Sequence, residues 1–197
     1  MIDHLLYALA WAAFGLAHSL LAGEGIKRRL APLLGRGYRL AYNLIALLSA
    51  GMVWTVGFTL IDPTPFAVPA WVGWLRVLLL LAGLLVMGWA MKGYDGGRLL
   101  GYRQIREPAL PEDEPLRTDG LHRYVRHPLY AGGLLILISL AGDPLGLATA
   151  IWGGLYLILG AHFEERRLLA RYGRAYADYI SRVPAFLPWK GRTGAGK

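Results

Sequence analysis

Four ionisable residues and one tyrosine lie at the ends of apolar segments in the second half of the chain. Arg126, His127 and Tyr130 stand where a polar stretch runs into a short apolar segment, and Glu164 and Glu165 close the next one. Ionisable groups at membrane depth are costly unless they are paired or used. A carboxylate, a histidine and an arginine that converge at one pocket could hold a charged cofactor with an amino acid end and a cationic centre.

These residues also have a purely structural interpretation. Arg126 and His127 could be interfacial side chains, and Glu164 and Glu165, with the two arginines that follow, could form a solvated, ion-paired helix end. His18, in the first apolar segment, could donate a hydrogen bond in helix packing, although a histidine within a membrane favours a functional hypothesis. Composition leaves these alternatives open.

The composition indicates a polytopic membrane protein. The chain has 197 residues, of which 55% are hydrophobic, and its mean hydropathy is +0.39, which is too apolar for an ordinary soluble domain. With no cysteine, disulfides, thiolate metal sites and cysteine nucleophiles are excluded, and no metal site is expected. The first apolar run has no basic region before it, so we interpret it as a membrane span rather than a signal peptide.

Apolar segment lengths predict an all-α single domain over residues 1–197 with five transmembrane helices. They are expected at about 5–22, 38–61, 71–91, 121–142 and 144–165, with a cytoplasmic tail over 166–197. The last two form a tight hairpin that turns at Gly142-Asp143-Pro144, where Asp143 is expected to cap the following helix. Leu129 to Ala141 covers only roughly 20 Å as a helix, short of the roughly 30 Å hydrocarbon core. The start of the fourth span must therefore include Arg126-His127-Pro128 at membrane depth, and non-helical backbone there implies a pocket on the cytoplasmic side.

The charge distribution predicts the orientation. All of the Lys and Arg residues except Arg76 lie in the first to second connection, the third to fourth connection or the C-terminal segment. Because basic residues collect on the cytoplasmic side, we expect the N-terminus outside and the C-terminus in the cytoplasm, in a bacterial inner membrane. Arg76 is expected to reach back to the interface beside Trp71 and Trp74. The net charge of +8 therefore indicates a lipid bilayer rather than nucleic acid as the partner.

Order and spacing favour the catalytic interpretation over the structural one. RHPLYAGG, an apolar hairpin and EERRLLARYGRAYADYISRVPAFLPW together resemble the isoprenylcysteine carboxyl methyltransferase-like family, whose members are integral membrane methyltransferases that use S-adenosylmethionine. The first half of the chain is similar to the bacterial branch, which includes methanethiol S-methyltransferases and membrane proteins associated with nitrite and nitric oxide reduction. Ala17-His18-Ser19, GYRLAYNLIA and Leu100 to Gln104 carry that second likeness.

The resemblance implies S-adenosyl-L-methionine as cofactor and S-adenosyl-L-homocysteine as product. By resemblance, the cofactor contacts would be Gln104, Arg117, His122, His127, Pro128, Leu129, Tyr130, Glu164 and Glu165, with Glu164 on the charged methionyl part. The segment Glu114 to Arg117 is an alternative to Gln104 for the loop contacts. Prenylcysteine enzymes are expected to carry an arginine one turn before this glutamate, where this chain has Gly160.

The absence of that cation disfavours a prenylcysteine carboxylate as substrate. We expect the acceptor to enter sideways from the lipid, which favours a small or lipophilic acceptor, most simply a methanethiol-like thiol. A thiol must ionise to react, so Arg103 or Arg126 could stabilise the thiolate, and His18 or His127 could accept its proton. The alternatives are an isoprenylcysteine-type carboxyl or lipid methyltransferase, and a non-enzymatic accessory protein of nitrogen-oxide respiration. A small transporter would usually show internal repeats, which the sequence lacks. The oligomeric state is left open.

Overall fold

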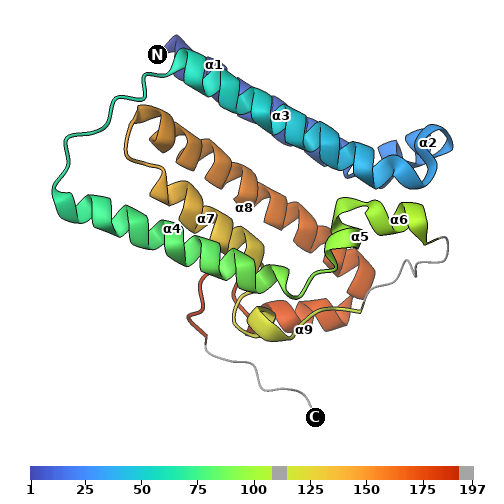
Figure 1. Ribbon diagram of the computed structural model, residues 1–197. Coiled ribbons are helices and arrows are strands. Elements are labelled where there is room, and N and C mark those ends of the chain that lie inside the picture. The colour runs from blue at the N-terminus through green and yellow to red at the C-terminus, as the bar shows by residue number, and fades with distance from the viewer. Residues whose placement is uncertain (108–114, 191–197) are drawn as a thin grey trace.

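The described part of the chain is entirely helical. The computed structural model describes residues 1–107 and 115–190, so Glu112 to Glu114 and the end of the expected tail, 191–197, lie outside the described residues. Figure 1 shows the arrangement of its elements, which in chain order are α1 (Ile2–Leu21), α2 (Glu24–Leu34), η1 (Gly35–Gly37), α3 (Tyr38–Leu60), α4 (Ala70–Met91), α5 (Gly96–Leu100), α6 (Tyr102–Arg106), η2 (Gly120–Arg123), α7 (Pro128–Ser139), α8 (Pro144–Tyr172) and α9 (Arg174–Arg182). The all-α prediction is confirmed for these residues.

Four helical stretches are long and apolar enough to cross a membrane: Ile2–Leu21, Glu24–Leu60, Ala70–Met91 and Pro144–Tyr172. The chain is therefore an integral membrane protein, and the first three predicted spans agree closely with α1, α3 and α4. The fourth does not, because α7 begins at Pro128 and has 12 residues, about 18 Å of helix. Proline disfavours helical backbone in the residue before it, and His127 accordingly has φ −123° and ψ 66°.

The long helices run antiparallel to those that precede them in the chain, whereas α1 and α8, which are neighbours in space, run parallel (Figure 1). The order of contacts runs from α3 to α1, then to α8, α7 and α4, and Figure 1 shows α1 and α3 side by side on one edge. The hydroxyls of Tyr7 on α1 and Thr149 on α8 lie 2.8 Å apart in the buried core. This contact fixes α1 against the first half of α8, so the other halves of the two helices lie at the end of the molecule where α2 begins.

The α4 and α7 helices approach each other through two glycines. A Cβ added at Gly83 would lie 2.7 Å from the Gly132 carbonyl oxygen, and one added at Gly132 would lie 2.6 Å from Cγ of Met87. Small residues let helix backbones approach closely in a membrane. The glycine contact therefore holds the short α7 helix against a helix that is long enough to span.

The predicted hairpin between the last two apolar segments is present. The Asp143 carboxylate accepts a hydrogen bond from the Gly146 N–H at 2.7 Å, and Pro144 occupies the first helical position. Arg76, predicted to reach the interface, donates from Nε to the Ser139 carbonyl at 2.8 Å. That carbonyl is one of those left without an intrahelical partner at the end of α7, so Arg76 satisfies it.

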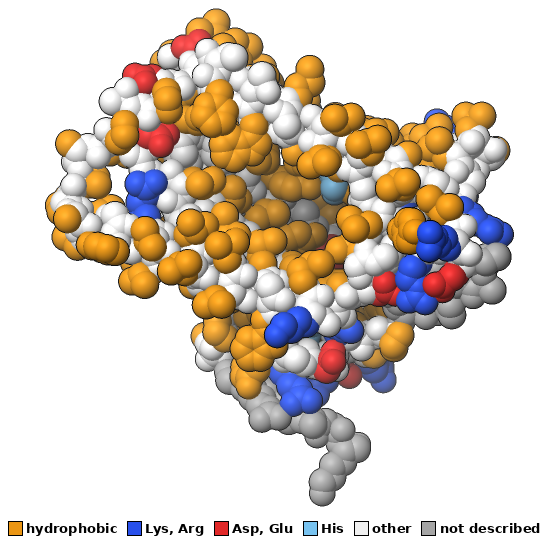
Figure 2. Space-filling view, viewed as in Figure 1, with side chains coloured by type: hydrophobic (Ala, Val, Ile, Leu, Met, Phe, Trp, Pro, Cys, Tyr) orange, Lys and Arg blue, Asp and Glu red, His pale blue; other side chains and the backbone are white. Residues whose placement is uncertain are grey.

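Basic side chains gather at one end of the molecule, as the alternating connections predict. Figure 2 shows most Lys and Arg side chains at the end that carries α2, α6 and α9, while hydrophobic side chains cover the flanks. Many of these flanking side chains are exposed, with Leu85 and Met52 more than two-thirds accessible. Such a surface fits contact with lipid tails, and the charged end fits the aqueous boundary.

Candidate active site

The segment before α7 is held by the C-terminal part of the chain. The Arg126 N–H donates to the Pro184 carbonyl at 2.9 Å, and the His127 N–H donates to the Ala185 carbonyl at 3.0 Å. The non-helical backbone that the sequence places here is thus satisfied by protein, as backbone at this depth must be. Pro128 follows as a fully buried residue at the start of α7.

A buried ionic cluster joins this segment to α8. Arg126 binds the same Glu165 carboxylate oxygen through Nε at 2.8 Å and Nη2 at 2.6 Å, and it also donates from Nη1 to the Val183 carbonyl. His127, which is 5% exposed, places Nε2 3.0 Å from that oxygen of Glu165. The predicted convergence of an arginine, a histidine and a carboxylate is therefore present, with Glu165 as its centre.

Glu164 has a different environment from its neighbour. Its carboxylate lies 3.9 Å from Nδ1 of His127 and is 41% exposed, and it interacts with the Tyr130 hydroxyl. Among the described residues, no lysine or arginine forms an ion pair with it. The Glu164 carboxylate therefore has room and capacity for a cationic ligand, whereas Glu165 is already occupied.

Aromatic rings surround the histidine at the start of α7. The ring of His127 lies 5.5 Å from that of Tyr130 and 5.8 Å from that of Phe186, measured between centroids. Leu129, next to Pro128, is partly buried. The predicted run from His127 to Tyr130 thus forms an apolar and aromatic wall beside the Glu164 carboxylate, a surface on which a planar ring could lie.

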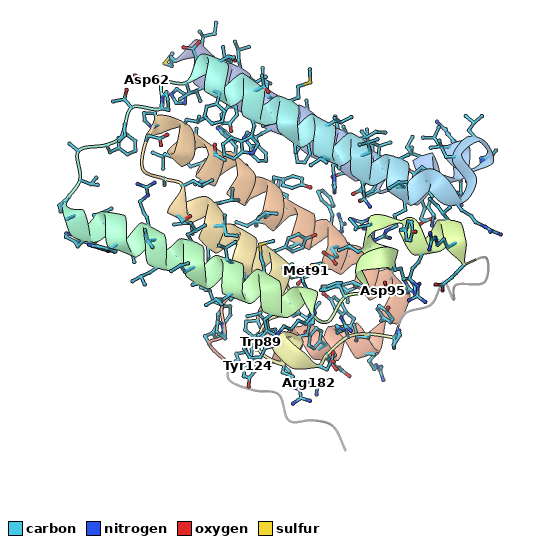
Figure 3. The ribbon with its side chains drawn as sticks, in the orientation of Figure 1. Asp62, Trp89, Met91, Asp95, Tyr124 and Arg182 are labelled. Atoms are coloured by element: carbon cyan, nitrogen blue, oxygen red, sulfur yellow. The ribbon has the colours of Figure 1, made fainter. Side chains whose placement is uncertain are left out.

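A pocket of about 180 Å³ opens between the end of α4 and η2. It contains two of the predicted loop residues, and its lining consists of Trp89, Ala90, Lys92, Gly93, Arg117, Asp119, Gly120, Leu121 and His122. Figure 3 labels Trp89 and Met91 at the last turn of α4, at the end of the molecule where Asp95 begins α5. The pocket carries lysine, arginine and histidine side chains together with Asp119, which is paired with Arg117 at 3.4 Å, and this lining suits a polar ligand group.

His122 connects the pocket to the ionic cluster. Its Nδ1 lies 3.1 Å from the Arg126 carbonyl, and the Tyr179 hydroxyl donates to the His122 carbonyl at 2.5 Å. Burial lowers the pKa of the His122 imidazole below its usual value, although the hydrogen bond to the Arg126 carbonyl opposes that shift. The neutral ring is therefore favoured, and it donates its Nδ1 proton to that carbonyl, which can only accept.

The two predicted residues on α6 lie apart from this cluster. Arg103 donates to the Glu107 carboxylate at 2.9 and 2.7 Å and is also paired with Asp95; these two carboxylates raise its pKa further above its usual value. Gln104 donates to the Arg98 carbonyl at 2.9 Å. Their contacts are with α5 and the end of α6, so the structure does not bring them to Glu164 or His127 in the part of the chain that it describes.

His18 lies in a separate aromatic group contributed by three helices. The Tyr42 hydroxyl of α3 is 2.6 Å from its Nε2, and the ring of Tyr156 on α8 is 5.8 Å away. The Arg167 guanidinium, which the sequence reasoning missed, acts electrostatically on both His18 and Tyr42. A signal was available, because Arg167 follows Glu164 by three residues and so shares its face of α8.

An apolar hollow is open on the flank of the molecule. Figure 2 shows it between the α3 and α4 sides, lined by hydrophobic side chains with one histidine side chain in view. The α3 and α4 helices are the outermost members of the row α3, α1, α8, α7, α4. The α7 and α8 helices, which lie between them in that row, therefore form the back of the hollow. A lipid-soluble molecule could reach this hollow from the bilayer.

Comparison with known sequences places the chain. The sequence model described as NnrU protein matches residues 6–141. The chain belongs to this family. The chain is 30% identical to methanethiol S-methyltransferase 2 of Bradyrhizobium diazoefficiens over 93% of its length and 73% of that protein. It is 27% identical to methanethiol S-methyltransferase of Pseudomonas deceptionensis, over 95% of its length and 72% of the relative.

A third similarity supports the wider resemblance. Protein-S-isoprenylcysteine O-methyltransferase B of Arabidopsis thaliana is 27% identical over 40% of this chain and 42% of its own length. No solved structure matches the chain. The resemblance to isoprenylcysteine methyltransferase-like membrane proteins is therefore confirmed, and relatives named as methyltransferases support the membrane methyltransferase class for this NnrU family member.

Proposed function

We propose that this NnrU family protein transfers a methyl group from S-adenosylmethionine to the sulfur of a small or lipophilic thiol. The observation that carries the proposal is the Glu164 carboxylate, which has no Lys or Arg partner in the described chain and faces Tyr130 beside a buried ionic cluster. A partly exposed carboxylate without an ion-pair partner can accept a cationic ligand. The methionyl end of the methyl donor carries a cation.

The residues present fit the donor. Glu164 would hold its ammonium group, and His127 to Tyr130 would line it from the start of α7. Arg117 and His122, in the pocket between the end of α4 and η2, would contact its more polar parts from the loop side. When bound, the donor supplies an electrophilic methyl on a positively charged sulfur. The protein has to hold the acceptor in line with it at about 3 to 3.5 Å and keep water out.

The buried cluster would act by holding this wall in place. Arg126 and Glu165 fix the start of α7 against α8 and against the C-terminal segment. His127 shares the Glu165 oxygen and faces Glu164 with its other nitrogen, so its orientation is set on both sides. In this proposal, His127 contacts the methyl donor. The apolar hollow (Figure 2) admits the methyl acceptor from the bilayer.

A thiol is preferred over a carboxylate as acceptor. The relatives that match over most of the chain are named methanethiol S-methyltransferases, whereas the isoprenylcysteine relative matches 40% of it. Gly160 has no side chain, and the space at its Cβ position is open. This position therefore offers no cation to a substrate carboxylate.

Calorimetric titration of the detergent-purified protein with S-adenosylhomocysteine tests the donor site. We expect binding by the wild type and roughly tenfold to hundredfold weaker binding by Glu164→Gln, because a hydrogen bond to a charged group contributes about 1.5–3 kcal/mol. The matched control is Glu24→Gln, an exposed glutamate on α2. Wild-type affinity in Glu164→Gln would refute the role of that carboxylate, and no binding by folded wild type would favour the accessory-protein alternative.

The acceptor class is tested with a labelled methyl group on the donor. Ethanethiol, N-acetyl-S-farnesylcysteine and phosphatidylethanolamine are offered in separate reactions, and the label is expected in the thioether from ethanethiol. Label in the farnesylcysteine methyl ester or in the lipid, with none in the thioether, would replace the thiol by that acceptor.

A further inference from the structure

We infer that Arg167, His18 and Tyr42 form the acceptor subsite, in which Arg167 stabilises a thiolate and His18, positioned by Tyr42, takes the thiol proton. This inference rests on the proposed function and extends it to the acceptor side. It assigns the thiolate-stabilising role to a cation that the sequence reasoning did not select. Arg103 and Arg126, which that reasoning selected, are each bound to carboxylates.

Arg167 differs from those two arginines in its contacts. Its guanidinium makes long contacts of 3.5 Å to two backbone carbonyls, those of Ala22 at the end of α1 and Phe163 on α8. It forms no ion pair with a carboxylate among the described residues. An arginine is always charged. The guanidinium of Arg167 therefore places a positive charge beside the end of α1, and this charge can bind an anion.

The surroundings of Arg167 join the acceptor side to the donor side. The Ala22 carbonyl that Arg167 contacts lies one helical turn after His18, whose own carbonyl accepts from the Ala22 N–H at 2.9 Å. The Arg167 charge acts on His18, and together with Arg39 on Tyr42. It also acts on Tyr130, which itself interacts with Glu164. Glu164 and Arg167 are three residues apart and share one face of α8. The carboxylate proposed for the donor and the cation proposed for the acceptor therefore lie side by side, as a displacement between two bound partners requires.

The depth of this group fits a small acceptor that arrives from lipid. The α8 helix has 29 residues, or about 43 Å, against roughly 30 Å for the hydrocarbon core. Its last turns therefore extend beyond the core, and Glu164 and Arg167 lie near the boundary. Phe14 and Tyr156, whose rings are 5.0 Å apart, form an apolar wall next to His18. The subsite therefore fits a molecule with an apolar part against these rings and an ionised sulfur beside Arg167.

Tyr42 is a positioning residue for His18. The shorter of its two contacts is the 2.6 Å contact with Nε2. When the phenol oxygen accepts a hydrogen bond from the Nε2–H group, the imidazole is the tautomer whose Nδ1 carries a free lone pair. The Nδ1 atom then accepts the proton of the incoming thiol, and the imidazole releases it to water after the reaction.

The transfer step balances with these groups. The thiol S–H bond breaks and its proton goes to Nδ1 of His18, which leaves a thiolate beside Arg167. The thiolate electron pair forms the new sulfur–carbon bond to the methyl group. The bond from that carbon to the positive sulfur of the donor breaks, and its electron pair remains on the donor sulfur, which becomes neutral.

The test compares Arg167→Gln with Arg166→Gln, an exposed neighbour in the same turn, on two thiols. Ethanethiol must be ionised by the protein, whereas trifluoroethanethiol is much more acidic and ionises readily without help. For Arg167→Gln we expect kcat/KM for ethanethiol to fall about tenfold for each pKa unit that the lost charge supplied, with a much smaller loss for trifluoroethanethiol. Arg167→Lys, which keeps the charge, is expected to restore most of the rate.

Two further readouts extend this comparison, one that needs no turnover and one that does not change Arg167. Calorimetric binding of ethanethiol to protein loaded with S-adenosylhomocysteine is expected to weaken in Arg167→Gln and not in Arg166→Gln. Tyr42→Phe is expected to lower kcat more than it changes KM and to shift the acid limb of the pH profile, because the reacting tautomer of His18 is no longer selected.

The outcomes separate this inference from the proposed function. If folded wild type does not bind S-adenosylhomocysteine, the proposed function fails and the inference fails with it. If wild type binds it and methylates thiols, but Arg167→Gln loses the same factor on both thiols or loses nothing, the inference alone is wrong. Unchanged S-adenosylhomocysteine affinity in Arg167→Gln, with selective loss on ethanethiol, supports it.

Discussion

Two adjacent glutamates on α8, Glu164 and Glu165, have different contacts and therefore different roles. Consecutive residues of an α-helix project about 100° apart, so Glu165 faces Arg126 and His127 while Glu164 faces Tyr130. The Glu165 side chain is 19% exposed and the Glu164 side chain is 41% exposed. The buried carboxylate therefore has a structural partner, and the accessible one can take a ligand.

Replacing Arg126 by methionine tests the structural half of this pair. The substitution leaves Glu165 without its arginine and frees the Val183 carbonyl that Arg126 binds, and breaking a buried ion pair costs about 3–5 kcal/mol. We expect a lower unfolding midpoint in detergent and faster proteolytic cleavage after Arg182. Arg174→Met, on an exposed position of α9, is the control. A variant that unfolds and is cleaved like wild type would show that the cluster does not hold the C-terminal segment.

The α4–α7 pair is the element on which the position of His127 depends. The α7 helix is too short to be fixed by the bilayer thickness, so its depth is set by packing against α4 and α8. The glycine contact on one side and the Asp143 cap at the hairpin on the other supply that packing. A shift of α7 along α4 would move its first residues away from Glu164.

Gly132→Ala tests this dependence. The added Cβ would lie 2.6 Å from Cγ of Met87 and 2.9 Å from the Gly83 carbonyl, and overpacking of this kind costs about 1–3 kcal/mol. We expect a lower unfolding midpoint together with weaker S-adenosylhomocysteine binding. Gly88→Ala on the same α4 helix, where the Cβ position is open, should leave both quantities unchanged. Equal behaviour of the two variants would contradict the role of the glycine contact.

The elements that the sequence predicted well are those that its apolar lengths define. The first three spans and the Asp143 cap depend on local composition, and the structure has them. The start of α7 depends on Pro128 and on hydrogen bonds to residues 184–185, which no local pattern encodes. The charged residues after 165 suggested the end of a helix, but α8 continues to Tyr172 because such residues also suit a helix that leaves the membrane.

The residues of the site follow the same division. The convergence of Arg126, His127 and Glu165 was predictable because their segments flank one hairpin. The pairing of Arg103 with Asp95 and Glu107, and the contact of Tyr42 with His18, involve side-chain directions and helix neighbours that only the folded chain defines. The roles of these residues in catalysis stay predictions.

On the scale of the whole molecule, the proposed function predicts that the basic end faces the compartment that supplies the methyl donor. The connections that carry the basic residues all lie at the end where Glu164 and the Lys92–His122 pocket are found. Basic connections favour the cytoplasmic side of a bacterial inner membrane. The basic connections and the proposed access of the methyl donor therefore predict the same topology, with the N-terminus outside.

The absence of cysteine from the sequence makes this topology directly measurable. Single cysteines are introduced at Val68, in the exposed connection before α4, and at Asp178, on the exposed face of α9, and cells are treated with a membrane-impermeant maleimide. We expect Val68→Cys to be labelled once the outer membrane is opened, and Asp178→Cys to be labelled only after the inner membrane is permeabilised. The parent chain, which cannot be labelled, gives the background. The reverse pattern would place Glu164 and the Lys92–His122 pocket on the outer side, away from a donor made in the cytoplasm, and would remove the topological support for the methyltransferase proposal.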